Sequence, residues 1–147
     1  MAAVTVEVAR EVTPDLVAAF EQLVPQLSRS SPPPDAATLA EVVASPSNTV
    51  FVARNGDRTI VGTLTLVVFR IPTATRAWIE DVVVDESARG RGAASALTNA
   101  AVARAVELGA RTVDLTSRPP REDANRLYQK LGFVKRETNV YRYDVPG

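Results

Sequence analysis

The most informative stretch of this sequence for chemistry is one in which glycines and arginines connect an apolar run to a long helical pattern. The run is Val82-Val83-Val84, and the connection contains Arg89-Gly90-Arg91-Gly92. Glycines let the backbone approach a ligand closely, and the unpaired N–H groups at a helix start favour a phosphate, to which the arginines could add positive charge. The simpler interpretation is that the glycines satisfy a turn and the arginines are solvated, because a glycine-rich loop before a helix is a weak motif.

Two known phosphate-binding patterns can be compared with this loop. The P-loop pattern does not fit, because no Gly-Lys-Ser/Thr follows the glycines. The dinucleotide fingerprint is closer to Gly90-Arg91-Gly92-Ala93-Ala94-Ser95, and Asp114 lies near the distance expected of a ribose-binding acid. However, Ser95 occupies the position of the third glycine, and antiparallel hairpin signals precede the loop. A nicotinamide-dependent reductase is therefore the weaker hypothesis.

Composition limits the chemistry that any site can use. The chain has 147 residues, 46% hydrophobic and 23% charged, with no Cys and no His. This composition is that of an ordinary globular protein, and the length predicts a single domain over residues 1–147. Without Cys there is no disulfide, thiolate nucleophile or zinc–sulfur site, and without His the usual general base and the commonest metal ligand are missing. Acid–base chemistry therefore falls to carboxylates, Tyr, Lys or hydroxyls, and we expect no metal.

Charge and hydropathy exclude two classes of partner. Lys plus Arg (17) balances Asp plus Glu (17), and the basic residues are scattered, so we expect no nucleic-acid partner. No segment approaches the roughly 20 apolar residues that a membrane helix needs, so we expect no membrane partner. The first ten residues alternate like a strand rather than like a signal peptide, and we expect a cytoplasmic protein.

Hydrophobic periodicity predicts a regular series of strands and helices. The predicted strands cover residues 4–8, 49–54, 59–69, 77–85, 112–115, 133–137 and 140–144, and the predicted helices cover 14–27, 35–44, 93–108 and 122–131. The order is β-α-α-β-β-β-α-β-α-β-β. A strand, helix, strand unit in the middle implies one parallel pairing among antiparallel ones. We therefore predict an α/β (α+β) fold, with a mixed, mostly antiparallel sheet of six to seven strands and four helices on its faces.

Two motifs connect this order to a known family. Arg89-Gly90-Arg91-Gly92-Ala93-Ala94 matches Arg/Gln-x-x-Gly-x-Gly/Ala at the start of a helix, and Leu127-Tyr128-Gln129-Lys130-Leu131-Gly132-Phe133 matches Leu-Tyr-x-x-x-Gly-Phe before a strand. With both motifs and the element order, nearly the whole chain resembles the Gcn5-related N-acetyltransferase (GNAT) family. The resemblance implies direct transfer of an acetyl group from acetyl-CoA to a primary amine, with no covalent enzyme intermediate.

The resemblance also implies a set of cofactor-binding residues. Backbone groups of the fourth strand would contact the acetyl and pantetheine part, the loop amides would hold the pyrophosphate, and an arginine would close the loop or contact phosphate. These residues are Val82, Val83, Val84, Arg89, Gly90, Arg91, Gly92, Ala93, Ala94 and Ser95. The side chains of the valines are expected in the core.

Two catalytic roles follow from the same resemblance. Tyr128 occupies the position of the acid that protonates the departing CoA thiolate, although its leucine neighbours would also suit a core tyrosine. Glu80 is expected to take the proton of the acceptor ammonium directly or through water, although it could instead face solvent or pair with an arginine. Its neighbour Asp81 should point to the opposite face of the strand.

The sequence departs from the family at one position in the last helix. Where many members place an Asn three residues before an Ala, counting back from Ala124 gives Arg121. Asn125 follows that Ala, so the cofactor contact is not transferred to it. Arg121 could reach a phosphate or the adenine ribose instead.

The acceptor amine is not identified by the sequence. In this fold it would be bound by the segment from Leu27 to Asp35 and by the turn at Thr138-Asn139, and nearby acids would suit a cationic amine such as a polyamine, aminoglycoside, amino acid or peptide N-terminus. The two closing strands are compatible with a homodimer. The alternative function is a non-catalytic acyl-CoA-binding sensor or partner domain, in which Glu80 and Tyr128 would be dispensable.

Overall fold

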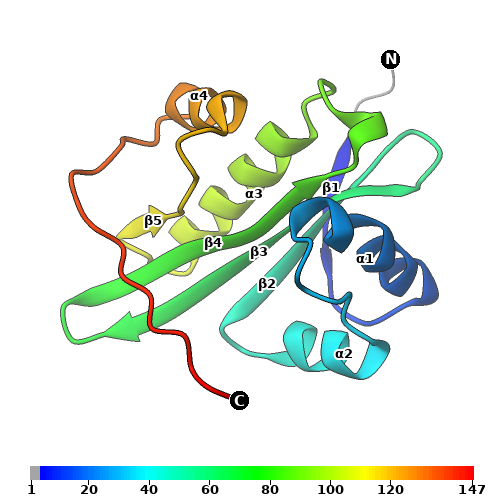
Figure 1. Ribbon diagram of the computed structural model, residues 1–147, viewed down its shortest axis with the longest axis horizontal. Coiled ribbons are helices and arrows are strands. Elements are labelled where there is room, and N and C mark those ends of the chain that lie inside the picture. Colours follow the sequence, from blue (N-terminus) through cyan, green and yellow to red (C-terminus); the bar gives the residue numbers. More distant parts are fainter. Residues whose placement is uncertain (1–3) are drawn as a thin grey trace. The chain divides into compact units, whose positions relative to one another are not determined.

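The computed structural model describes residues 4–147, and the chain forms two compact units (Figure 1). The first unit runs to Thr116 and the second comprises Ser117–Gly147. The first unit contains β1 (Thr5–Ala9), α1 (Pro14–Leu27), α2 (Ala36–Ala44), β2 (Asn48–Arg54), β3 (Ile60–Ile71), β4 (Ala74–Val84), the 3₁₀ turn η1 (Glu86–Ala88), α3 (Ala93–Glu107) and β5 (Thr112–Asp114). The second unit contains α4 (Glu122–Lys130).

The strands form one sheet in the order β1-β2-β3-β4-β5. The first three pairings are antiparallel, and β4 and β5 are parallel because α3 connects them as a crossover helix. The predicted element order is confirmed through the last helix, as is the mixed, mostly antiparallel sheet. The predicted element ends differ from the observed ones by a few residues at most.

The helices of the first unit cover both faces of this sheet (Figure 1). Thr13 and Asp35 cap α1 and α2 through hydrogen bonds from the N–H groups of Leu16 (3.3 Å) and Thr38 (2.8 Å), as their residue types favour. These two helices and one face of the sheet share a core, which is made by Leu16, Ala19, Phe20, Leu23, Leu39, Val50, Val52, Ile60 and Val83.

The opposite face of the sheet is covered by α3. Gly62 precedes Thr63, which pairs with Val52 and Val83 of the α1 core, so strand alternation turns Gly62 to the other face. A Cβ at Gly62 would lie 3.2 Å from Cδ1 of Leu97 on α3, which shows how closely this helix packs. Small buried residues, Ala101 and Ala105, allow that approach.

The predicted final strand pair, residues 133–137 and 140–144, is wrong: within residues 4–147 the sheet has five strands, not six to seven. The segment has the β-branched and aromatic residues of a strand, but Val134, Val140, Tyr141 and Tyr143 are more than 70% exposed. Alternation shows only that residues are compatible with a strand, whereas a strand also needs a hydrogen-bonded neighbour. Among the described residues no other segment of the second unit supplies one.

No helix among residues 4–147 is long and apolar enough to cross a membrane.

Candidate active site

One side of β4 is left open where β4 and β5 separate. The two strands pair only from Arg76↔Thr112 to Trp78↔Asp114. β5 ends there, whereas β4 continues to Val84, so from Ile79 onward this side of β4 has no strand partner among the described residues of the first unit. An unpaired edge offers backbone N–H and C=O groups to whatever binds beside it.

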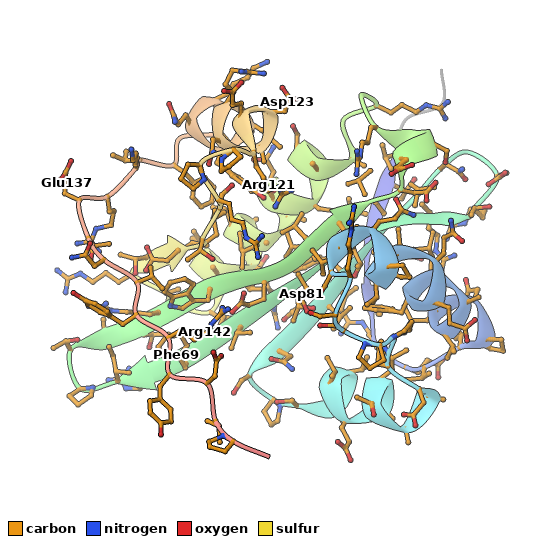
Figure 2. The ribbon with its side chains drawn as sticks, viewed as in Figure 1. Phe69, Asp81, Arg121, Asp123, Glu137 and Arg142 are labelled. Carbon is orange, nitrogen blue, oxygen red and sulfur yellow. The ribbon has the colours of Figure 1, made fainter. Side chains whose placement is uncertain are left out.

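The open edge contains a β-bulge at Asp81. Thr63 pairs with Val83 and Thr65 pairs with Glu80, so two residues of β4 lie opposite one residue of β3. Asp81 has φ +51°, a left-handed conformation that is uncommon for a residue other than glycine (Figure 2 marks its place on β4). The bulge bends β4 at the point where β5 leaves it.

The bulge changes which side chains share a face. Thr63 and Thr65 face the same side of β3, so their partners Val83 and Glu80 both face the α1 side although they are three residues apart. Strict alternation was the basis for predicting that Asp81 lies on the opposite face from Glu80. The bulge interrupts that alternation between Glu80 and Val83. Glu80 is therefore held beside the α1–α2 layer by backbone geometry.

Backbone alternation distinguishes the three valines that follow Asp81. Asp85 donates its N–H to the carbonyl of Val61 (2.8 Å), so Val61/Asp85 is a hydrogen-bonded pair of the antiparallel ladder. Alternation makes Thr63/Val83 the next such pair and turns the backbone groups of Val84 toward the open edge, while Val82 lies in the bulge and has no register partner on β3. The edge thus presents Val84, whereas the Val83 side chain is buried in the α1 core.

The end of β4 leads into a tightly turned loop. Asp85 caps η1 by accepting a hydrogen bond from the N–H of Ser87 (3.3 Å). The pKa of Asp85 is below its ordinary value of 3.8, mainly because of a hydrogen bond from Gln26 and secondly because of one from Ser87. Gly90 and Gly92 follow with φ +81° and +83°, where any other residue would be strained. A Cβ at either glycine would meet nothing within 4 Å, so the space above the loop backbone is open.

The start of α3 faces this open space with unsatisfied donors. Gly92 is the N-cap residue and offers no side chain, and the first helical bond runs from Ala96 N–H to the carbonyl of Gly92 (3.0 Å). The amides of Ala93, Ala94 and Ser95 are thus the free N–H groups that every helix start carries. Together with the helix dipole they favour an anion.

Two exposed arginines lie in the same loop. Within residues 4–147, neither Arg89 nor Arg91 forms an ion pair. Arg91 lines a cavity of about 140 Å³ with Asn55, Gly56 and Asp57 of the β2–β3 turn. Both charges are therefore available to an anion, and they add to the field of the helix start.

Glu80 has the electrostatics of a carboxylate base. Desolvation, and then the neighbouring charge of Asp81, raise its pKa from the ordinary value of 4.5. A raised pKa makes the carboxylate a stronger base. Its side chain is exposed, so it can meet a ligand from solvent.

In the second unit, Tyr128 of α4 is 8% exposed. Its ring meets that of Phe133 edge to face, with centroids 5.9 Å apart, and Phe133 N–H donates to the Tyr128 carbonyl (2.9 Å). Burial raises the pKa of the phenol from 10.0, and the charge of Arg121 opposes this. The phenol is therefore neutral at physiological pH and can donate a proton.

The first turn of α4 is bonded to the turn that precedes the helix. The side-chain amide of Asn125 donates to the carbonyls of Arg118 (3.1 Å) and Pro119 (3.4 Å), so it fastens the proline-containing turn. Arg121 is exposed at the N-cap of α4 (Figure 2).

Comparison with known proteins identifies the family. A model of the Acetyltransferase (GNAT) family matches residues 15–133, which include the open edge, the loop and Tyr128. The chain belongs to the GNAT acetyltransferase family. The sequence matches no protein of curated function.

Solved structures agree with the GNAT assignment. An acetyltransferase from Trypanosoma brucei is 26% identical, with a TM-score of 0.78 over 97% of this chain and 99% of that one. A transcriptional regulator from Bacillus halodurans C-125 is 29% identical, with a TM-score of 0.75 over 96% and 99%. An aminoglycoside acetyltransferase from an uncultured soil metagenomic sample, in complex with sisomicin, has a TM-score of 0.84 over 98% and 97%, and at 21% identity it shows the shared fold alone.

Sequence reasoning missed two features of this GNAT site. The bulge at Asp81 could not be seen in the alternation of apolar and polar residues. A positive φ is usually marked by a glycine, and this position holds Asp. Gln26 bonds to Asp85 across 59 residues, and a glutamine in a helix carries no sign of a distant partner. Only the packing of α1 against the sheet brings that pair together.

Proposed function

We propose that this chain is an acetyl-CoA-dependent N-acetyltransferase that transfers an acetyl group directly to a primary amine. The observation that carries the proposal is the loop from Arg89 to Gly92, where two left-handed glycines place an uncapped helix start beside an open strand edge. An anion-binding helix start next to free backbone groups suits a long ligand with a phosphate at one end and amides at the other. The family match supports the acyltransferase class.

In this proposal, the amides of the loop and of the first turn of α3 bind the pyrophosphate of CoA. The groups involved belong to Gly90, Arg91, Gly92, Ala93, Ala94 and Ser95, with Arg89 adding charge. The backbone of Val82 and Val84 would bind the pantetheine amides and the acetyl oxygen along the open edge. Val83, whose backbone pairs with β3, holds the edge in place through the core.

Glu80 and Tyr128 would handle the protons. The acceptor ammonium must lose a proton to Glu80, directly or through water, before its nitrogen attacks the thioester carbonyl. As the carbon–sulfur bond breaks, the electron pair goes to sulfur, and Tyr128 would donate the proton that converts the thiolate to a thiol. The raised pKa of Glu80 makes it a stronger base, and the phenol of Tyr128, whose pKa is also raised, is still protonated when the thiolate leaves.

The acceptor is proposed to be cationic. Glu80 and Asp81 are exposed at the bulge, and Glu86 is exposed at the start of η1. Acidic side chains favour an ammonium group through Coulomb attraction. The neighbour solved with sisomicin is an aminoglycoside acetyltransferase, so aminoglycosides belong in the first set of amines to be screened, with polyamines, amino acids and peptides.

The second candidate is a non-catalytic acyl-CoA-binding sensor. The observation that favours it is the resemblance to a protein described as a transcriptional regulator. A sensor would use the same loop and open edge but would not need Glu80 or Tyr128. The proposed single domain over residues 1–147 is common to both candidates and is supported by a family match that extends into both units.

Thermal unfolding with ligands, followed by a turnover assay, tests the proposal. Acetyl-CoA or CoA at about 100 times its dissociation constant should add roughly 2.7 kcal/mol, which raises the melting temperature by about 5–10 °C. Release of free CoA thiol with any amine in the screen would then support the enzyme. Binding without release by any amine would favour the sensor, and a shift with NADH alone would refute both.

A further inference from the structure

A glutamine at the end of α1 is bonded to the start of the cofactor loop. The side-chain amide of Gln26 donates to Oδ1 of Asp85 (2.6 Å), and its Oε1 accepts the N–H of Glu86 (3.0 Å). It also donates to the carbonyl of Gln22 one turn earlier in the helix (3.1 Å). Gln26 is half-buried, and its contact with Asp85 is part-buried. One side chain thus joins α1 to both residues at the turn out of β4.

The orientation of this amide is fixed by its partners. A carboxylate and a helix carbonyl can only accept, whereas the N–H of Glu86 can only donate. Only the orientation with the amide nitrogen toward Asp85 and Gln22 and the oxygen toward Glu86 satisfies all three. The bond to Asp85 is charge-assisted, which makes it stronger than a bond between neutral groups.

We propose that Gln26 is a positioning residue for CoA binding, because its two bonds fix the direction in which the chain leaves β4 and enters the phosphate-binding loop. The inference rests on the proposed function of that loop. Asp85 caps η1, and η1 ends at Ala88, directly before Arg89 and the two glycines. Glycines at φ above +80° do not by themselves fix the path of the backbone through the loop. The residues on either side of them must therefore fix it.

The position of Gln26 in α1 adds a consequence for the acceptor. Pro25 lies inside the helix, where it lacks the N–H that would bond to the preceding turn. Gln26 follows it, and Leu27 ends the helix and begins the segment expected to bind the amine. The same side chain therefore connects the start of the segment expected to bind the amine to the start of the cofactor loop. A change in the conformation of one of these segments should therefore alter ligand binding at the other.

Reversing the polarity of the bond tests the proposal. Gln26→Leu removes both bonds, and Gln26→Glu places two carboxylates against each other, so each should weaken CoA binding about tenfold. Combining Gln26→Glu with Asp85→Asn exchanges donor and acceptor in the bond to the loop, and should recover part of the affinity lost in Gln26→Glu, while the carbonyl of Gln22 stays without its donor. Glu21→Gln, at an exposed position of the same helix, is the control and should bind CoA normally.

Calorimetric titration of CoA gives these affinities. In steady-state kinetics, the single variants of Gln26 should have a higher KM for acetyl-CoA and an unchanged kcat. Normal CoA affinity in Gln26→Leu, or a double variant no better than the single Gln26→Glu variant, would overturn the proposal. A loss of affinity in Glu21→Gln as large as in Gln26→Leu would do the same, because the effect would then belong to the helix in general.

Hydrogen exchange separates this inference from the proposed function. Without ligand, the amide of Glu86 should exchange about tenfold faster in Gln26→Leu than in the wild type, while amides of β2 and β3 keep their protection. If wild-type protein binds no CoA, the proposed function fails, and faster exchange at Glu86 still shows that Gln26 fixes the loop. Unchanged exchange at Glu86 refutes the positioning role whether or not CoA binds.

Discussion

Replacing Gly92 by Ala separates backbone strain from ligand binding, because a second glycine provides a matched control. Gly92 has φ +83° and Gly109, after the end of α3, has φ +81°. A Cβ at either position would meet nothing within 4 Å, so neither substitution creates a steric clash within the protein. The stability cost of each is therefore the left-handed conformation alone.

That cost can be worked out from the backbone. A left-handed conformation costs a residue with a Cβ roughly 1–2 kcal/mol, and the stiffer unfolded chain returns about 0.4–1 kcal/mol. Both Gly92→Ala and Gly109→Ala should thus lose about 1 kcal/mol of unfolding free energy, a fall in melting temperature of about 2–4 °C. Only Gly92→Ala should also weaken CoA binding, by about tenfold, because its methyl group enters the space where the phosphate must approach the amides.

Differential scanning calorimetry measures the first effect, and calorimetric titration of CoA measures the second. Equal CoA affinity in Gly92→Ala and wild type would refute the assignment of the loop as the phosphate site. A similar loss of affinity in Gly109→Ala would show instead that general destabilisation, not the loop, controls binding.

Three further variants test the acid, the base and the core. Tyr128→Phe keeps the buried ring and its contact with Phe133, so kcat should fall roughly 10²–10⁴-fold with melting temperature unchanged, and an unchanged kcat would remove the hydroxyl from the chemistry. Glu80→Gln should abolish the rise of kcat/KM with pH that titration of Glu80 above 4.5 causes, and an undisturbed pH profile would exclude the base role. Because the folded-state pKa of Glu80 is raised, its contribution to stability is present below pH 4.5 and lost as pH rises, so the same variant should unfold at pH 7 no more easily than wild type. Leu97→Ala removes a side chain with 0% exposure between α3 and Gly62, which should cost about 3 kcal/mol in urea unfolding, and a cost below about 1 kcal/mol would contradict the close packing.

The sequence predicted the elements whose signals are local. The helices predicted over 14–27 and 35–44 depend on signals from residues near in the chain, and α1 and α2 begin within one residue of the predicted starts. The start of α3 after Gly92 was found for the same reason. The final strand pair was wrong because strand formation depends on a partner that no local pattern supplies.

The candidate site shows the same division at the level of single residues. The loop glycines could be identified from their type, because a positive φ is what glycine provides most cheaply. The face on which the Glu80 side chain lies could not be predicted, because it depends on one extra residue in β4 relative to β3. A shift of one residue moves a side chain from one face of a sheet to the other. Without the bulge, Glu80 would face α3 and be separated by the sheet from the layer formed by α1 and α2. The left-handed backbone of Asp81 therefore has a chemical consequence: the bulge places the Glu80 carboxylate, whose pKa is raised, on the face of the sheet that α1 covers.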